Sequence, residues 1–323
     1  MMNTKDSFGW ERRLIEFNGL LLSKARDLFY YSPYSFLRTI SHERLGRETF
    51  AEPLIGSVAS GKSSLSAEIQ DGKTTWFVWR NLAWDSDYFR RRVVRIELII
   101  SDHEDSDTVA VAVNRFLGRF TNSGDYLFMT VPCEDLLLLR SLAGTGFRQV
   151  ETRLNYYFTG FESAQSPTLP VRMAVADDIP ILRDVAMRMR NRFDRVHADP
   201  AFTDEEADSY LGTFAEESVR GFADMVAVPD LPGVKPFGFL AAGNPGRVMD
   251  LNIAKLVLAA VDNSEHRGWM FHLLGWIIQE LKKKDADILT TITQASNRPA
   301  IRTWEKAGFL LGFVNHVYSY SNK

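Results

Sequence analysis

The sequence has little that would support a disulfide framework, a membrane span or a strong electrostatic field at the protein surface. Its single cysteine, Cys133, excludes an internal disulfide, and no apolar run reaches the roughly 18 to 20 residues that a membrane span requires. The formal charge of −3 excludes a nucleic-acid or membrane partner held by bulk electrostatics, because such binding needs a concentrated positive field. The amino terminus lacks the positive-then-apolar layout of a signal peptide, so we expect a cytoplasmic protein.

The composition is that of a globular chain with room for two cores. The chain has 323 residues, of which 45% are hydrophobic and 24% charged. A length about twice that of one typical domain predicts two cores of roughly 150 residues each. A Gly/Ser/Pro-containing stretch at 159–167 indicates the boundary, which predicts one domain at 1–160 and another at 168–323.

Hydrophobic periodicity predicts strands interleaved with single helices, which is typical of an α/β (α+β) layer structure. Helices are expected at 10–45, 109–120, 178–192, 270–283 and 299–306. Strands are expected at 75–79, 93–100, 126–131, 171–175, 224–228, 237–242, 255–261, 288–293 and 313–320.

The two halves of the sequence are similar to each other. Placing Gly146-Phe147 on Gly308-Phe309 shifts the chain by 162 residues and aligns strand, helix, Gly-Phe and a closing aromatic strand in both places. A repeat of this period indicates a duplicated domain, since solenoid units are shorter. The alternative is a chance likeness between two common strand-helix-strand units.

The strongest local signal is a strand that leads into a helix start. The apolar run 255–261 is followed by 262–268 and an apolar-periodic helix, so free backbone N–H groups and a positive helix end would suit a pyrophosphate. Further on, Asn297 is a good N-cap, Pro299 fits a first helical turn and Gly308 is a good helix terminator.

These two segments resemble the GNAT superfamily of acyl-CoA N-acyltransferases, from about residue 169 onward. The string Asn-x-x-Ala-x-x-x-aromatic-x-x-x-Gly-Phe that begins at Asn297 is similar to the last helix of that family. The resemblance implies tandem GNAT-like domains, each a mixed sheet flanked by helices, with acyl-CoA as co-substrate and no metal. The strand at 255–261 would splay from its neighbour to admit the coenzyme. The cofactor-binding residues it implies are Ala259, Ala260, Val261, Arg267, Gly268, Trp269, Met270, Phe271, His272, Asn297 and Trp304.

Two positions depart from the family pattern. Met270 and His272 stand where the phosphate turn usually has small residues. Trp304 stands where the family commonly has a tyrosine that protonates the departing thiolate, and an indole N–H has negligible acidity. Trp304 is therefore either a packing residue or a contact of the cofactor.

A narrower resemblance concerns the acceptor. The stretch 192–200 and the segment 82–89 are similar to the TDP-fucosamine acetyltransferase type, in which the first GNAT-like half is degenerate and shapes the substrate site. It implies direct acylation, with acetyl or a larger acyl such as 3-hydroxybutyryl, of the amine of a nucleotide-linked amino-dideoxy sugar for surface polysaccharide or lipopolysaccharide. The C3 or C4 position of the amine, the nucleotide and a homodimer stay open. Substrate-binding residues would be Trp84, Asp85, Asp194 and Arg195, and catalysis would involve His197 or Asp199 as base and strand N–H groups near Ala260 or Val261.

Two other readings compete. Gly56 to Ser63 matches the phosphate-binding loop of nucleotide hydrolases, although Pro53 interrupts the strand that should precede it. A non-catalytic GNAT-like binding module is the third hypothesis, because Met270 and His272 would obstruct the phosphate turn.

Overall fold

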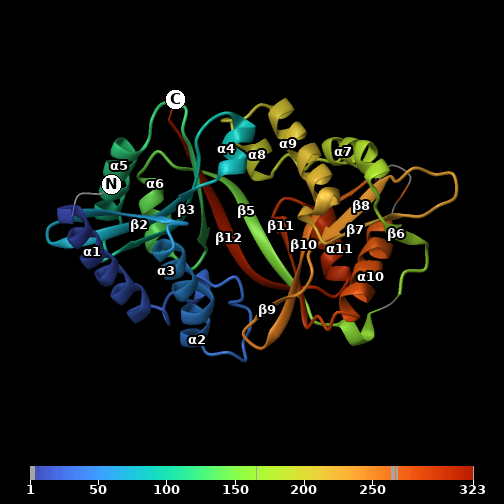
Figure 1. The fold of residues 1–323 in the computed structure, drawn as a ribbon, viewed down its shortest axis with the longest axis horizontal. Coiled ribbons are helices and arrows are strands. Elements are labelled where there is room, and N and C mark those ends of the chain that lie inside the picture. The colour runs from blue at the N-terminus through green and yellow to red at the C-terminus, as the bar shows by residue number, and fades with distance from the viewer. Residues whose placement is uncertain (1–3, 165, 263–265, 267, 323) are drawn as a thin grey trace. The chain divides into compact units, whose positions relative to one another are not determined.

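The structure, a computed structural model, describes residues 4–164, 166–262, 266 and 268–322. The chain divides into two compact units (Figure 1). The first unit comprises residues 1–150 and 313–323, and the second unit comprises 151–312. Each half of the sequence therefore contributes its last strand to the unit that is built mainly from the other half. In the described part of the chain, no helix is both long enough and apolar enough to cross a membrane.

The first unit is a mixed sheet with helices on both faces. Its strands follow the order β1-β2-β3-β4-β12, and all neighbours are antiparallel except β3 and β4. Side chains alternate along β2, so Phe77 packs toward α5 and α6 while Trp76 and Val78 pack toward α1 and α3. The helices are α1 (Thr4–Ser23), α2 (His42–Gly46), α3 (Glu52–Ala59), α4 (Ala83–Phe89), α5 (Ser106–Phe120) and α6 (Leu136–Ala143). The strands are β1 (Ser64–Gln70), β2 (Lys73–Asn81), β3 (Val93–Ser101), β4 (Tyr126–Pro132) and β12 (Leu310–Ser321).

The second unit repeats this plan. Its strands follow the order β5-β11-β10-β8-β7-β6, β9 also pairs with β10, and only β10 and β11 run parallel. The helices are α7 (Ile179–Arg188), α8 (Arg195–Ala198), α9 (Asp204–Glu217), α10 (Trp269–Lys282) and α11 (Arg298–Lys306). The strands are β5 (Arg148–Phe158), β6 (Val171–Met173), β7 (Met225–Pro229), β8 (Gly238–Ala242), β9 (Gly246–Val248), β10 (Leu251–Val261) and β11 (Ile288–Gln294).

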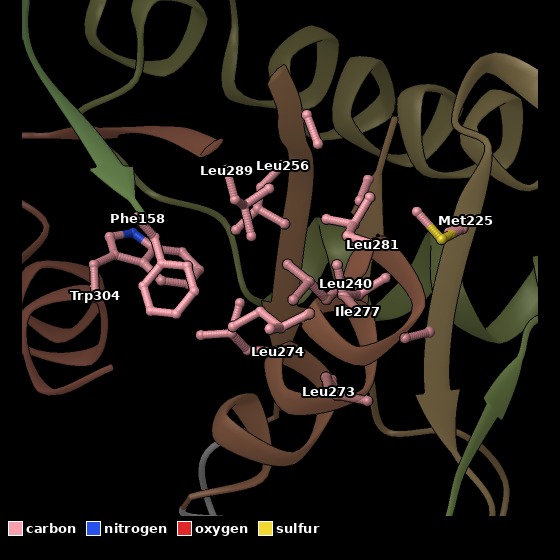
Figure 2. Close-up of a cluster of buried hydrophobic side chains, with 14 of the residues drawn as sticks. Phe158, Met225, Leu240, Leu256, Leu273, Leu274, Ile277, Leu281, Leu289 and Trp304 are labelled. Atoms are coloured by element: carbon pink, nitrogen blue, oxygen red, sulfur yellow. The ribbon is translucent and has the colours of Figure 1, made fainter. Parts of the chain in front are cut away.

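A buried cluster fixes α10 against the sheet of the second unit. Leu273, Ile277 and Leu281 lie on one side of α10 and are fully buried (Figure 2). They pack with Leu240 of β8 and Leu289 of β11. Burial of each such side chain contributes about 1.5 to 3 kcal/mol, so the start of α10 is held firmly beside the end of β10.

The internal repeat predicted from the sequence is confirmed by element bounds. With the shift of 162 residues, the bounds of β4 fall on those of β11. The first residues of α6 and β5 fall on the first residues of α11 and β12. Asp135 and Asn297 even perform the same task, because each side chain accepts a hydrogen bond from the N–H three residues later. The fold is thus a tandem α/β arrangement of one repeated plan.

Some predicted bounds are wrong. The helix expected at 10–45 ends at Ser23, and the chain continues through turns and a short 3-10 helix at Phe29–Tyr31. The helix expected at 178–192 ends at Arg188. The strand expected at 255–261 begins four residues earlier, at Leu251, where its first three residues pair with β9.

Candidate active site

The strands β10 and β11 part halfway along their length. They pair only where Ile253 to Lys255 meets Ile288 to Thr290. Beyond that point β10 stays bonded to β8 as far as Val261, and β11 stays bonded to β5 as far as Gln294. A register shift between Leu256 and Leu258 bends β10 at the place where the strands separate. The opening that the family resemblance implies is therefore present.

The opening leads into a cavity of about 470 Å³. One wall is the parted end of β10 from Lys255 to Ala260, and a second wall is the end of β11 from Thr291 to Gln294. One face of α11 forms the floor, with Asn297, Ala300 and Trp304. Of the residues expected to bind cofactor, Ala259, Ala260, Asn297 and Trp304 line this cavity, and so do Asp194 and Arg195 of the expected substrate residues.

A polar network that the sequence reading missed borders the same cavity. Glu151 is ion-paired with Arg153 at 2.8 Å, and its other oxygen accepts a hydrogen bond of 2.8 Å from the Gln294 amide. The Gln294 oxygen accepts a hydrogen bond of 2.6 Å from Asn191. These four residues come from β5, β11 and the segment after α7, and all line the cavity. Their sequence positions share no motif, because only the pairing of β5 with β11 brings them together.

His197 lies behind this wall and has no free nitrogen. Its Nδ1 is 2.7 Å from Asp194 and its Nε2 is 3.2 Å from Asp208, while the side chain is only 1% exposed. Burial acts to lower the pKa of His197, but the hydrogen bonds and charges of Asp194 and Asp208 outweigh it and raise that pKa above its ordinary value. Asp208 also binds Arg190. This arrangement favours a protonated His197, a buried cation whose ion pairs connect α8 to α9.

The two residues expected as base do not line the cavity. His197 is occupied on both ring nitrogens, and Asp199 is buried and accepts a hydrogen bond of 3.0 Å from the Ala201 N–H. Val261, expected near the oxyanion, is paired with Gly238 in β8 and lies one residue beyond the cavity lining. Their catalytic roles stay predictions, and the contacts of His197 argue against the role of base. Glu151 and Asp194 are the carboxylates that do line the cavity.

The start of α10 carries the predicted phosphate turn. Arg267 lies outside the described residues. Gly268 has a φ of 90°, a left-handed conformation that favours glycine, and α10 begins at the buried Trp269. Met270 is half-buried and packs against the hydrophobic cluster of Figure 2, so this side chain is directed to the core.

Phe271 and His272 line a second cavity, of about 510 Å³. Its other walls are residues 158, 160, 163–164 and 166–168, together with the last residue of α11 and the two that follow it, Lys306 to Gly308. Most of this lining is apolar, and His272 approaches the Thr168 hydroxyl at 3.4 Å. The residues of the expected phosphate turn are therefore shared between the core, the helix start and this second cavity.

The expected substrate residues Trp84 and Asp85 belong to the first unit. Both lie in the first turn of α4, and Trp84 is 44% exposed. Its ring stacks on Tyr88 with centroids 5.5 Å apart. Their part in acceptor binding stays a prediction.

The phosphate-loop reading of Gly56 to Ser63 is contradicted. Gly56 lies inside α3, which ends at Ala59, so the glycine-rich segment closes a helix and does not open one. Ser63 is buried and donates a hydrogen bond of 2.5 Å to Glu97, while Lys62 is exposed. A phosphate loop needs the free N–H groups of a helix start, which this segment lacks.

Comparison with known proteins places this geometry in a fold class. No family model matches the sequence, and no curated protein matches it either. A solved GCN5-related N-acetyltransferase from Sphaerobacter thermophilus is similar with a TM-score of 0.55 and 12% identity, covering 94% of this chain and 94% of that chain. A functionally unknown protein from Staphylococcus epidermidis ATCC 12228 has a TM-score of 0.50 and 11% identity, covering 80% of this chain and 94% of that chain. The chain therefore has the fold of the GCN5-related N-acetyltransferases, in tandem form.

Proposed function

We propose that the protein is an acyl-CoA-dependent N-acyltransferase whose second unit holds the coenzyme. The observation that carries this proposal is the parting of β10 from β11 above a cavity of about 470 Å³. Parallel neighbours that share three residue pairs and then separate leave one edge of β10 without its strand partner. Backbone N–H and C=O groups on such an edge need other partners, and the amides of pantetheine can supply them.

The remainder of the coenzyme fits the start of α10. The positive end of the helix dipole favours a diphosphate there, and the exposed Gly268 has no side chain to cover this end of the helix. The cavity beside Phe271 and His272 would take the adenosine end. In this proposal the thioester reaches the cavity that contains Ala260 and Trp304.

The reaction proceeds by direct attack in this proposal. The neutral amine adds to the thioester carbonyl, the C–S bond breaks, and coenzyme A leaves as thiolate while the amine loses a proton. Glu151 and Asp194 are the carboxylates in the described cavity lining, so they are our candidates to accept that proton directly or through water. Backbone N–H groups near Ala260 would stabilise the oxyanion.

The acceptor we propose is a nucleotide-linked amino-dideoxy sugar, used for a surface polysaccharide or lipopolysaccharide. Arginine and lysine side chains in the described lining support a phosphate-bearing acceptor, since guanidinium and ammonium groups carry several hydrogen-bond donors and bind phosphate. The cations are Arg153, Arg190, Arg195 and Lys255, and the carboxylates are Glu151 and Asp194. Arg153 pairs with Glu151 and Arg190 pairs with Asp208, so a phosphate next to the reacting sugar would share the donors of these guanidinium groups.

A thiol-release assay tests both the acyl transfer and the identity of the acceptor. The donors are acetyl-CoA and 3-hydroxybutyryl-CoA, and the acceptors are dTDP-linked 3-amino and 4-amino dideoxy sugars, with polyamines and protein amines as controls. We expect release of coenzyme A only with a sugar nucleotide. Release with polypeptide amines alone would refute the sugar and spare the acyl transfer, whereas no release with any amine would contradict the enzyme.

A non-catalytic acyl-CoA-binding module is the second candidate, and Trp304 favours it. The indole N–H is a hydrogen-bond donor that does not protonate a leaving group, so the cavity could bind coenzyme A and turn over nothing. Calorimetric binding of acetyl-CoA without thiol release in the assay above would support this candidate.

A further inference from the structure

A chain of three charged contacts begins and ends at the first cavity. Asp194 and Arg190 both line this cavity, whereas His197 and Asp208 are outside its lining. The His197 Nδ1 lies 2.7 Å from Asp194, and its Nε2 lies 3.2 Å from Asp208. The other oxygen of Asp208 accepts a hydrogen bond from the Arg190 Nη1. The chain runs from the segment after α7 through α9 and α8, which pack together in the second unit (Figure 1).

Asp208 divides its two oxygens between two cations. A carboxylate with both oxygens available can hold a guanidinium through two parallel hydrogen bonds. His197 occupies one oxygen of Asp208, so Arg190 is bound to the other alone. The second terminal nitrogen of Arg190 lies 3.4 Å from Asp204, a carboxylate that is 74% exposed. A guanidinium carries five N–H groups, so Arg190 keeps donors for a ligand in the cavity.

The other end of the chain is fixed by the backbone. The Asp194 Oδ1 accepts hydrogen bonds from the N–H groups of Val196 and His197, at 2.9 and 3.0 Å. Its Oδ2 remains for the imidazole Nδ1. The His197 side chain is only 1% exposed, and the ring is held at both nitrogens. His197 therefore has one orientation, in which its Nε2 is directed at Asp208.

His197 also sets the charge beside Arg190. Asp194 and Asp208 are two negative charges, and a protonated His197 and Arg190 balance them. A neutral side chain at position 197 would leave one negative charge in excess next to the cavity. A phosphate at Arg190 would then be repelled.

We propose that Arg190 binds the diphosphate of the acceptor and that His197 is the positioning residue that keeps Arg190 available, an inference that rests on the proposed function. Arginine suits this ligand because its planar group matches phosphate oxygens. Arg153 is the weaker candidate, since its Nε and Nη2 both lie within 2.9 Å of one Glu151 oxygen. His197 contacts neither the reacting amine nor the thioester and acts on the acceptor through Asp208 and Arg190.

Calorimetry with dTDP as the diphosphate probe tests the inference, with acetyl-CoA at saturation so that the coenzyme site is filled. His197→Asn can keep the donor to Asp194, but it releases Asp208 to Arg190 and should weaken dTDP binding about tenfold. His197→Gln can keep the donor to Asp208 and loses only the charge, so it should weaken dTDP binding about threefold. Both variants should bind acetyl-CoA as the wild type does, which checks that they fold.

A double-mutant cycle measures whether His197 acts through Arg190. Arg190→Gln should weaken dTDP binding about 30-fold, and adding His197→Asn should cause no further loss. Arg220→Gln is the control, because Arg220 pairs with Glu216 outside the cavity lining, and it should bind dTDP as the wild type does. Independent losses that multiply in the double variant would overturn the inference, and so would wild-type affinity for dTDP in Arg190→Gln or His197→Asn.

Failure of the inference and failure of the proposed function give different results. If the wild type binds acetyl-CoA but not dTDP, the diphosphate site is refuted and the acyl transfer is spared. If it binds dTDP with the expected losses in the variants but releases no thiol with any amine, the site stands and the enzyme is contradicted. If the folded wild type binds neither ligand, both fail.

Discussion

The two repeats open the same pair of strands and fill the opening differently. In the first unit β3 pairs with β4 only from Val93 to Ile96, and the continuation of β3 carries Leu98, Ile99 and Ile100, which are all buried. In the second unit the corresponding end of β10 carries the exposed Ala259 and the small Ala260, and a cavity lies beside them. The topology is shared, so the size of the side chains decides which repeat can admit a ligand.

The helix that follows the parted strand also differs between the two repeats, because its start is capped in the first and uncapped in the second. In the first unit α5 begins after Asp105, whose carboxylate accepts hydrogen bonds from the N–H and hydroxyl of Thr108. In the second unit α10 begins after Gly268, which has no side chain for this purpose. An acid at the helix start occupies the N–H groups and repels a phosphate. The first repeat thus has the same plan as the second, with a capped helix start and with large buried side chains where the second repeat has a cavity.

The largest expected effect comes from filling the second opening as the first is filled. Ala259→Phe should weaken acetyl-CoA binding about 100-fold, because a ring in the opening overlaps the path of the pantetheine. Ala59→Phe, at the exposed end of α3, is the control for an added ring and should bind as the wild type. Calorimetric titration measures both, and unchanged binding by Ala259→Phe would mean that the coenzyme does not pass between β10 and β11.

The next effect is electrostatic. Gly268→Asp places an acid at the start of α10, as in the first repeat, and should weaken acetyl-CoA binding about tenfold relative to Gly268→Asn. The two variants have the same shape and the same strain at a φ of 90°, so the ratio of their dissociation constants isolates the charge. A ratio near one would place the diphosphate elsewhere.

Removing the equivalent helix caps Asp135 and Asn297 should affect the free energy of unfolding and the affinity for acetyl-CoA differently. Asp135→Ala removes a cap and the acceptor of a 2.6 Å hydrogen bond from Tyr31, so we expect a loss of about 2 to 3 kcal/mol in unfolding free energy. Asn297→Ala removes a cap alone and should cost about 1 kcal/mol. Only Asn297→Ala should also change acetyl-CoA affinity. Denaturant unfolding and calorimetry test this pattern, and a binding defect in Asp135→Ala would contradict it.

The smallest effects are opposite responses to pH. The pKa of His197 is raised, so its stabilisation is complete below about pH 6.5 and is lost as pH rises through the folded pKa. Burial lowers the pKa of His316 in the first unit, so its contribution is complete above about pH 6.5 and is lost as pH falls. Thermal melts of His197→Gln and His316→Gln should be recorded over a range of pH and compared with the wild type. The difference in Tm between wild type and variant should change with pH in opposite directions for the two variants. Slopes of the same sign would refute the assigned charge states.

The sequence predicted the parts of the fold that leave a local signature. The repeat, the strand before the helix start and the cap at Asn297 were recoverable because turn residues and periodicity mark them. The exchange of the closing strands was not recoverable. β5 and β12 are similar aromatic strands, and either could close either sheet on pattern alone.

Only the residues of the site that belong to a sequence motif could be predicted. Ala259, Ala260, Asn297 and Trp304 follow from a motif, whereas Glu151 and Gln294 meet only because β5 pairs with β11. The prediction for His197 rested on residue type, and residue type does not reveal that two carboxylates occupy both ring nitrogens. Side-chain partners are a property of tertiary packing, so sequence spacing alone does not supply them.

The stoichiometry of acetyl-CoA binding tests the central claim most directly. A calorimetric titration of the whole chain should show one molecule bound per chain, because the second repeat is open and uncapped while the first is filled and capped. Two molecules per chain would mean that the buried side chains of the first repeat do not exclude the coenzyme. No binding by the folded protein would contradict the account of the parted strands altogether.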